Sequence, residues 1–161
     1  MPKCRYSTSS GPEAPKFEEP ILPLASPAFI RQHHLRRPEQ LLDVPLIQSN
    51  VNVVQWTDWF DAFTEKRPPE RLTLRFDRAQ RAVEAAVQGL GVALESTVMA
   101  GAHLAAGRLL PVFGHDRSVR VKAHFAVYPA RHARQPPVEA FLSWVQAEAA
   151  HSADRLGGSS A

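Results

Sequence analysis

Cysteine is almost absent from this sequence, with Cys4 the single thiol among 161 residues. One cysteine excludes an internal disulfide framework and a cysteine-rich zinc site, and it is typical of a reducing compartment. No run approaches the roughly 18 consecutive apolar residues that a membrane-spanning helix needs, and the first twenty residues contain no apolar signal segment. We therefore expect a cytoplasmic protein with no membrane partner.

Patterns that carry catalysis or bind metals are also missing. The seven histidines form neither H-E-x-x-H nor H-x-x-x-H, and no G-x-S-x-G turn is present. Gly89-Leu-Gly91 follows a helical pattern and precedes a strand, the reverse of the order in a dinucleotide-binding loop, so we interpret Gly89 as a helix terminator. The sequence predicts no enzyme, no metal site and no cofactor.

The charge that is present is mainly arginine, with 15 Arg and 4 Lys in a chain of net charge +3. The densest basic run is Arg31–Arg37. Such a run usually forms a solvated helix face or loop, and an anion-binding or nucleic-acid surface is the alternative.

Short apolar runs alternate with helical patterns, which predicts an α/β fold with a mostly parallel small sheet and flanking helices. The expected strands are Ile21–Ala25, Leu46–Ser49, Leu72–Phe76, Gly91–Leu94, Leu109–Phe113 and Val121–Tyr128. The expected helices are Pro27–Gln32, Trp56–Phe63, Arg78–Gln88, Ser96–Ala106 and Pro136–Ala150.

The strand–helix–strand segment Leu72–Leu94 is the clearest unit. Asp77 is the expected N-cap of its helix, with Gln80 completing a capping-box-like arrangement. An Ala/Val stripe containing Val83 should pack on the sheet, and the flanking strands should run parallel through a right-handed crossover.

Three aromatic residues, Trp56, Trp59 and Phe60, fall together on one short expected helix. Packing against the sheet is the favoured interpretation, because clustered aromatics are usually core residues. A stacking platform for a planar ligand is the alternative.

Six motifs then follow one another in a familiar order: PILPLASPAFIR, LLDVPLIQS, WTDWFDAF, LTLRFDRAQRAVEAAVQGLGVAL, LAAGRLLPVF and AVYPARHARQPPVEAFLSWVQAEA. This succession resembles the C-terminal part of LysR-type transcriptional regulators and is most similar to the glycine-cleavage-activator-like subgroup. The resemblance covers about residues 18–150, between a flexible segment 1–17 and a frayed tail 151–161.

The resemblance implies a periplasmic-binding-protein type II-like lobe, the second of the two in an effector domain. It implies a small-molecule effector, such as an amino acid or another small anion, and DNA contact only through a helix-turn-helix that we expect this truncated chain to lack. The alternative is a non-catalytic interaction module that docks on full-length regulators and modulates their oligomers.

Ligand-binding residues are expected at the carboxyl ends of strands, beside helix N-termini. Simple helix capping is the alternative role for each. The candidates are Ser26, Pro27, Phe76, Asp77, Arg78, Glu95 and Ser96.

The last expected helix carries an apolar stripe at i, i+3, i+4 and i+7. In relatives this helix packs on the other lobe, so the stripe should serve self-association or partner binding. Its members are Val138, Phe141, Leu142 and Val145.

Overall fold

The computed structural model describes residues 17–69, 74–124, 132 and 134–157. The segment Glu19–Val121 forms one compact unit, here called the sheet unit, and the described residues on either side of it belong to a second unit. Within the described residues, no helix is both long and apolar enough to cross a membrane.

A six-stranded sheet organises the sheet unit, in the order β3-β2-β4-β1-β5, with β6 also pairing with β1. Strand β2 runs parallel to β3 and β4, whereas β1 runs antiparallel to β4 and β5. The predicted α/β fold is confirmed, with the parallel part limited to β3-β2-β4. The strands are β1 (Phe17–Ala25), β2 (Leu46–Ser49), β3 (Leu74–Phe76), β4 (Val92–Ser96), β5 (Leu110–Pro111) and β6 (Val119–His124).

Two of the helices have the predicted bounds, and so does strand β2. Helix α4 is shorter than predicted, because residues 97–100 form turns before it begins. Helix α5 continues to Gly157, into the segment predicted as a frayed tail, and Phe17 belongs to β1. The helices are α1 (Pro27–Gln32), α2 (Trp56–Phe63), α3 (Ala79–Val87), α4 (Gly101–Ala105) and α5 (Pro136–Gly157), with 3-10 turns at Pro38–Asp43 and His115–Arg117. The predicted positions 1–16, 70–73, 125–131 and 158–161 lie outside the described residues.

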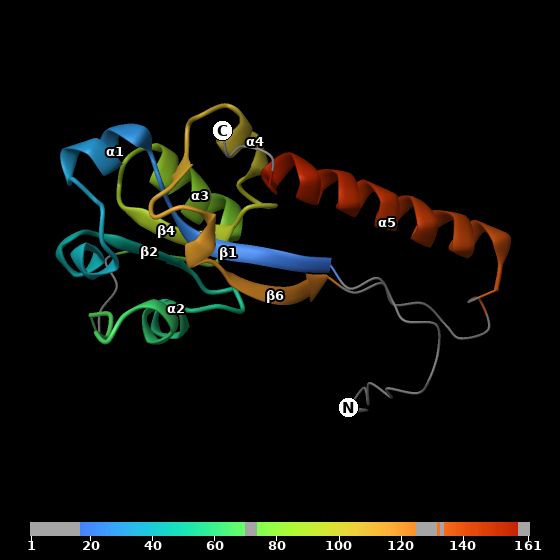
Figure 1. Ribbon diagram of the computed structural model, residues 1–161, viewed down its shortest axis with the longest axis horizontal. Helices are drawn as coiled ribbons and strands as arrows, with labels where there is room; N and C mark the ends of the chain where they lie inside the picture. Colours follow the sequence, from blue (N-terminus) through green and yellow to red (C-terminus); the bar gives the residue numbers. More distant parts are fainter. Residues whose placement is uncertain (1–16, 70–73, 125–131, 133, 158–161) are drawn as a thin grey trace. The chain divides into compact units, whose positions relative to one another are not determined.

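Helix α3 connects β3 to β4, and β2 pairs with both strands, so β3 and β4 are parallel but not adjacent. Helix α3 packs beside β4 (Figure 1). The predicted cap is wrong: the helix begins at Ala79, its N-cap is Arg78, and no side chain caps it. Asp77 therefore lies one residue too early. Gly89 ends the helix with φ of +75°, as predicted, and its N–H donates to the Ala86 carbonyl at 3.0 Å.

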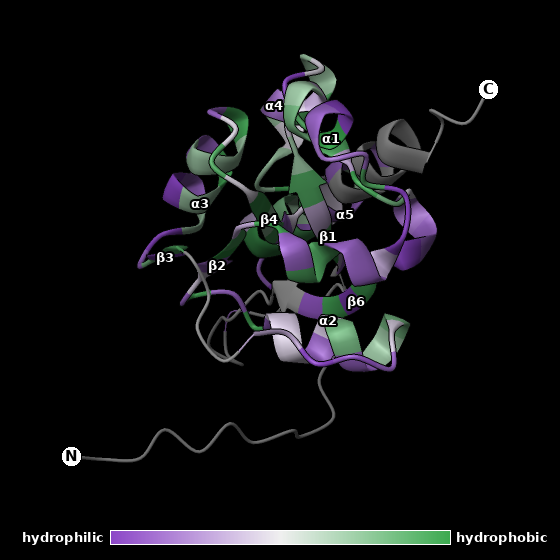
Figure 2. Cartoon of the chain, turned by 90° about the vertical axis from the view of Figure 1, so that its left-hand side faces the viewer, coloured by the Kyte–Doolittle hydropathy of each residue, from purple (hydrophilic) through white to green (hydrophobic). Residues whose placement is uncertain are grey.

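The sheet has a hydrophobic core on each face. On one face Trp56, Trp59 and Phe60 of α2 are buried together, which confirms the core interpretation of this helix. On the other face Ala82 and Val83 of α3 pack with Ile47, Leu22 and other strand residues, as the predicted stripe requires. Figure 2 shows hydrophobic residues concentrated on the central strand β4 and hydrophilic residues on outer turns of α1 and α3.

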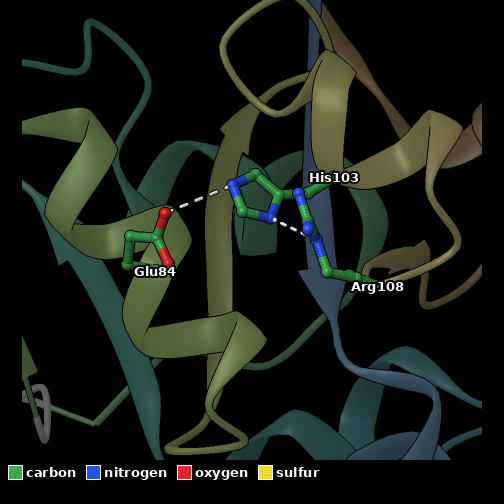
Figure 3. Close-up of polar contacts among 3 residues, drawn as sticks. All are labelled: Glu84, His103 and Arg108. Carbon is green, nitrogen blue, oxygen red and sulfur yellow. Dashed lines mark hydrogen bonds and ion pairs between the residues drawn. The ribbon is translucent and has the colours of Figure 1, made fainter.

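A polar contact links α3 to α4 (Figure 3). His103 Nδ1 accepts a hydrogen bond from Arg108 Nε at 3.1 Å, and His103 Nε2 lies 3.3 Å from Glu84 Oε1. Since Nδ1 is the acceptor, the hydrogen of the ring is on Nε2, and this N–H group faces the Glu84 carboxylate. This contact fixes the helix that follows β4 against the helix that precedes it.

Candidate functional site

Polar residues gather where the parallel strands β2, β3 and β4 reach their carboxyl ends. Ser49 pairs with Phe76 across β2 and β3, and Leu22 of β1 pairs with Glu95. The β2–β4 register places Ile47 opposite Ala93, so Ser49 falls opposite Glu95. Four strands thus contribute one row of side chains across the sheet.

The middle of this row points to the face that α3 covers. Side chains alternate along a strand, and Ile47 and Ala93 both belong to the core beneath α3. Ser49 and Glu95 come two residues later and share that face. The Thr97 N–H donates to the Pro20 carbonyl at 3.1 Å, which continues the β1–β4 register and directs Thr97 to the same face.

Three atoms of this group lack a hydrogen-bond partner among the described residues: Ser49 Oγ, Glu95 Oε1 and Thr97 Oγ1. Their residues are 0%, 1% and 0% exposed. Buried polar atoms in native proteins are nearly always hydrogen-bonded, because leaving one without a partner costs about 1–3 kcal/mol. Three such atoms at neighbouring positions make this region a candidate site. We call these three residues the orphan cluster.

Glu95 is the acid of the orphan cluster. Burial raises its pKa from 4.5 to about 7, a hydrogen bond with the Ser96 backbone lowers it, and the nearby charge of Glu19 raises it. The other carboxylate oxygen, Oε2, accepts a hydrogen bond from Asn52 Nδ2 at 3.5 Å. The same amide donates to the Leu94 carbonyl at 3.0 Å, so Asn52 links the segment after β2 to β4 beside Glu95.

Ser96 and Glu19 form a second polar contact, on the opposite face of the sheet. The Ser96 hydroxyl donates to Glu19 Oε1 and accepts from the Val98 and Met99 N–H groups. Both predicted residues of this region, Glu95 and Ser96, lie inside β4 rather than after it. Every residue of β4 is buried, and the strand continues to Ser96, two residues beyond the expected strand Gly91–Leu94.

The structure does not bring Ser26 and Pro27 to this site. Strand β1 is antiparallel to β4, so its carboxyl end lies at the other edge of the sheet. The register places Ser26 level with Gly91, about 16 Å along the strand from Ser96 at ~3.3 Å per residue. Ser26 Oγ accepts from the Phe29 N–H at 3.3 Å, which is the capping role.

The three residues predicted at the end of β3 differ in exposure. Phe76 is half-buried and packs against the core beneath α3, whereas Asp77 and Arg78 are exposed. Sequence reasoning missed Ser49, Asn52 and Thr97. Ser49 ends an expected strand that runs parallel to β4, so the carboxyl-end rule could have found it.

The predicted interface on α5 is apolar but not buried. Val138, Leu142 and Val145 are half-buried, whereas Phe141 is 56% exposed. Trp144, outside the predicted stripe, is 60% exposed, and its ring centroid lies 6.1 Å from that of Phe141.

Known proteins are similar to this chain in sequence and in fold. The LysR substrate binding domain family matches residues 9–150. The chain belongs to this family. Its sequence and α/β fold are those of an effector-binding domain of LysR-type transcriptional regulators.

One relative of this LysR-family chain is the uncharacterized HTH-type transcriptional regulator y4mQ of Sinorhizobium fredii. It is 38% identical over 135 residues, which are 83% of this chain and 44% of the relative. The glycine cleavage system transcriptional activator of Escherichia coli is 28% identical over 145 residues, 87% of this chain and 46% of that protein. The chain thus spans less than half the length of these curated relatives.

Among solved structures, the effector domain of the transcriptional regulator AmpR of Pseudomonas aeruginosa superposes with a TM-score of 0.65 at 29% identity. The match covers 88% of this chain and 67% of that domain. The family assignment and this structural match agree on an effector-binding domain.

Proposed function

We propose that the chain is the effector-sensing part of a cytoplasmic, non-catalytic LysR-type regulator, with the effector at the carboxyl edge of β2, β3 and β4. The orphan cluster carries the proposal, because three buried polar atoms without partners are the place where a ligand gains hydrogen bonds. Phe76 pairs with Ser49, Asp77 and Arg78 follow Phe76 in the chain, and Ser96 follows Glu95 on the opposite face of the sheet. Ser26 and Pro27 then serve only to cap α1.

The sheet unit corresponds in this proposal to the second lobe of an effector domain, and DNA contact belongs to the helix-turn-helix of an intact regulator. An amino acid or another small anion is the effector class that the resemblance implies. The glycine-cleavage-activator-like subgroup stays a prediction, since y4mQ is 38% identical and the glycine cleavage activator 28%.

A second candidate function is an interaction module that docks on full-length regulators. The exposed aromatic pair Phe141 and Trp144 on α5 favours it, because exposed large apolar side chains commonly mark protein contacts. Under this alternative the chain modulates regulator oligomers without binding an effector.

A thermal-shift screen of the full chain against amino acids and small carboxylates separates the two functions. An effector domain gains stability in proportion to RT ln(1 + [L]/Kd), so at least one compound should raise the Tm in a concentration-dependent manner. A screen with no shift, together with a complex between the chain and a full-length LysR-type regulator in light scattering, would support the interaction module instead.

A further inference from the structure

The orphan cluster contains an acid, Glu95, and its composition favours a ligand of positive charge. It offers, on one face of the sheet, one carboxylate oxygen, which only accepts when the acid is ionised, and two hydroxyl oxygens, which accept as well as donate. No arginine or lysine forms an ion pair with Glu95 among the described residues. The helix on this face presents Ala82, Val83 and Ala86 to the core, so it brings no charge to the acid.

A primary ammonium group matches this arrangement. It carries one positive charge and three N–H donors, and it accepts nothing. Each of the three buried acceptors would receive one donor, and the acid would gain the counter-charge that it lacks. An anion would instead place a second negative charge beside Glu95.

Resting on the proposed function, we propose that Ser49, Glu95 and Thr97 bind the ammonium group of a small-molecule amine, and that this site makes the effector an amine. The apolar residues that follow β2 and β4 in the chain favour an amine with an apolar body. Val51 and Val53 follow β2 and are 61% and 68% exposed, and Val98 and Met99 follow β4 at 54% and 50%.

The Asn52 side chain lies beside Glu95 and competes with an amine for its carboxylate. Its bond to Glu95 Oε2 measures 3.5 Å, longer than the 2.7–3.2 Å usual for N–H···O bonds, so a charged donor competes with it effectively. Asn52 also holds the segment between β2 and α2 through the Leu94 carbonyl.

Protonation of Glu95 should oppose amine binding. Its pKa of about 7 in the free protein means that the acid is mostly protonated at pH 6 and mostly ionised at pH 8. Glu19 is the other charged group that acts on it, and Asp77 and Arg78 at the start of α3 are exposed. Amine affinity should accordingly fall about tenfold from pH 8 to pH 6.

Calorimetric titration of the full chain tests the proposal with three probes of one shape: 3-methylbutylamine, 3-methylbutanol and 4-methylpentanoate. At pH 8 the amine should bind about tenfold more tightly than the alcohol, since charge-assisted bonds are stronger than neutral ones, and the carboxylate should not bind. Equal binding of amine and alcohol, preference for the carboxylate, or an unchanged amine affinity at pH 6 would overturn the amine site. Tight binding of the carboxylate would contradict the amine site alone, because it would still agree with the proposed function, an effector site at this edge of the sheet.

Variants connect the affinity to the three residues. Glu95→Gln keeps the shape and removes the charge, so amine affinity should fall at least tenfold while the Tm at pH 8 stays the same or rises. Thr97→Val and Ser49→Ala should each weaken binding several-fold, and Glu39→Gln, an exposed acid elsewhere on the sheet unit, is the matched control. Undiminished binding in Glu95→Gln would overturn the assignment whatever the other variants show.

Discussion

At the scale of single residues, Glu95 links the stability of the protein to pH. Its pKa is raised from 4.5 to about 7, so the folded state favours the protonated acid. The contribution of Glu95 to the free energy of unfolding is therefore fully present below pH 4.5, and it is lost as the pH rises through 7 and the buried acid ionises. Glu95→Gln should remove this dependence and raise the free energy of unfolding at pH 8 by roughly 3 kcal/mol.

Denaturant unfolding of both proteins between pH 4 and pH 8 measures this difference. The stability gap should be near zero at the acidic end and widen toward pH 8. A variant that is less stable than the parent at pH 8 would show that the charged acid is well solvated or paired.

Position 91 requires glycine because there is no room for a side chain, not because of its backbone conformation. A Cβ atom at this position would lie 2.4 Å from the Pro45 carbonyl oxygen, which also accepts the Val92 N–H at 2.9 Å. Gly91→Ala should therefore push β4 away from the chain before β2 and cost about 1–3 kcal/mol.

Gly101→Ala is the matched control for this prediction, because a Cβ there meets nothing within 4 Å and the residue starts α4. It should be neutral or stabilising by up to about 1 kcal/mol. Thermal unfolding that ranks the two variants in the reverse order would contradict the close approach at Gly91.

At the scale of elements, α3 depends on its buried stripe. Val83 is 1% exposed and lies in the core shared with the strands. Val83→Asp would bury an unpaired carboxylate and should cost on the order of 4 kcal/mol. The exposed neighbour Arg81, changed to Asp, should cost far less, and equal melting temperatures for the two variants would place Val83 outside the core.

Local signals explain which elements were predictable. Ser26 and Pro27 define the start of α1, and Gly89 defines the end of α3, because caps and turns depend on residues a few positions apart. The predicted Asp77 cap failed by one residue, a shift that the chain pattern alone does not resolve. The predicted length of α4 was wrong too. The Ser96 hydroxyl accepts hydrogen bonds from the Val98 and Met99 N–H groups, and the chain turns before the helix begins.

The candidate site was only partly predictable, for a non-local reason. Glu95 and Phe76 were found from the carboxyl-end rule, which holds for the parallel strands. The same rule selected Ser26 because nothing in its neighbourhood shows that β1 is antiparallel. Strand direction is set by pairing between residues some seventy positions apart, as between Leu24 and Ala93.

At the scale of the whole molecule, the apolar side chains of α5 should control self-association. Phe141 and Trp144 are exposed, and burying one such side chain is worth about 1.5–3 kcal/mol. Phe141→Glu should raise solubility and weaken any oligomer, whereas Gln146→Glu adds the same charge at an exposed polar position. Identical monomeric light-scattering profiles for the parent chain and Phe141→Glu would contradict an interface here.

The central claim is that a small-molecule effector binds where β2, β3 and β4 end. Amide chemical shifts of the full chain, followed by NMR while a stabilising compound from the thermal-shift screen is added, test it most directly. The account predicts that the changes concentrate at Ser49–Asn52, Phe76–Ala79 and Glu95–Thr97. Changes confined to the opposite edge, around Ser26 and Pro27, would contradict it.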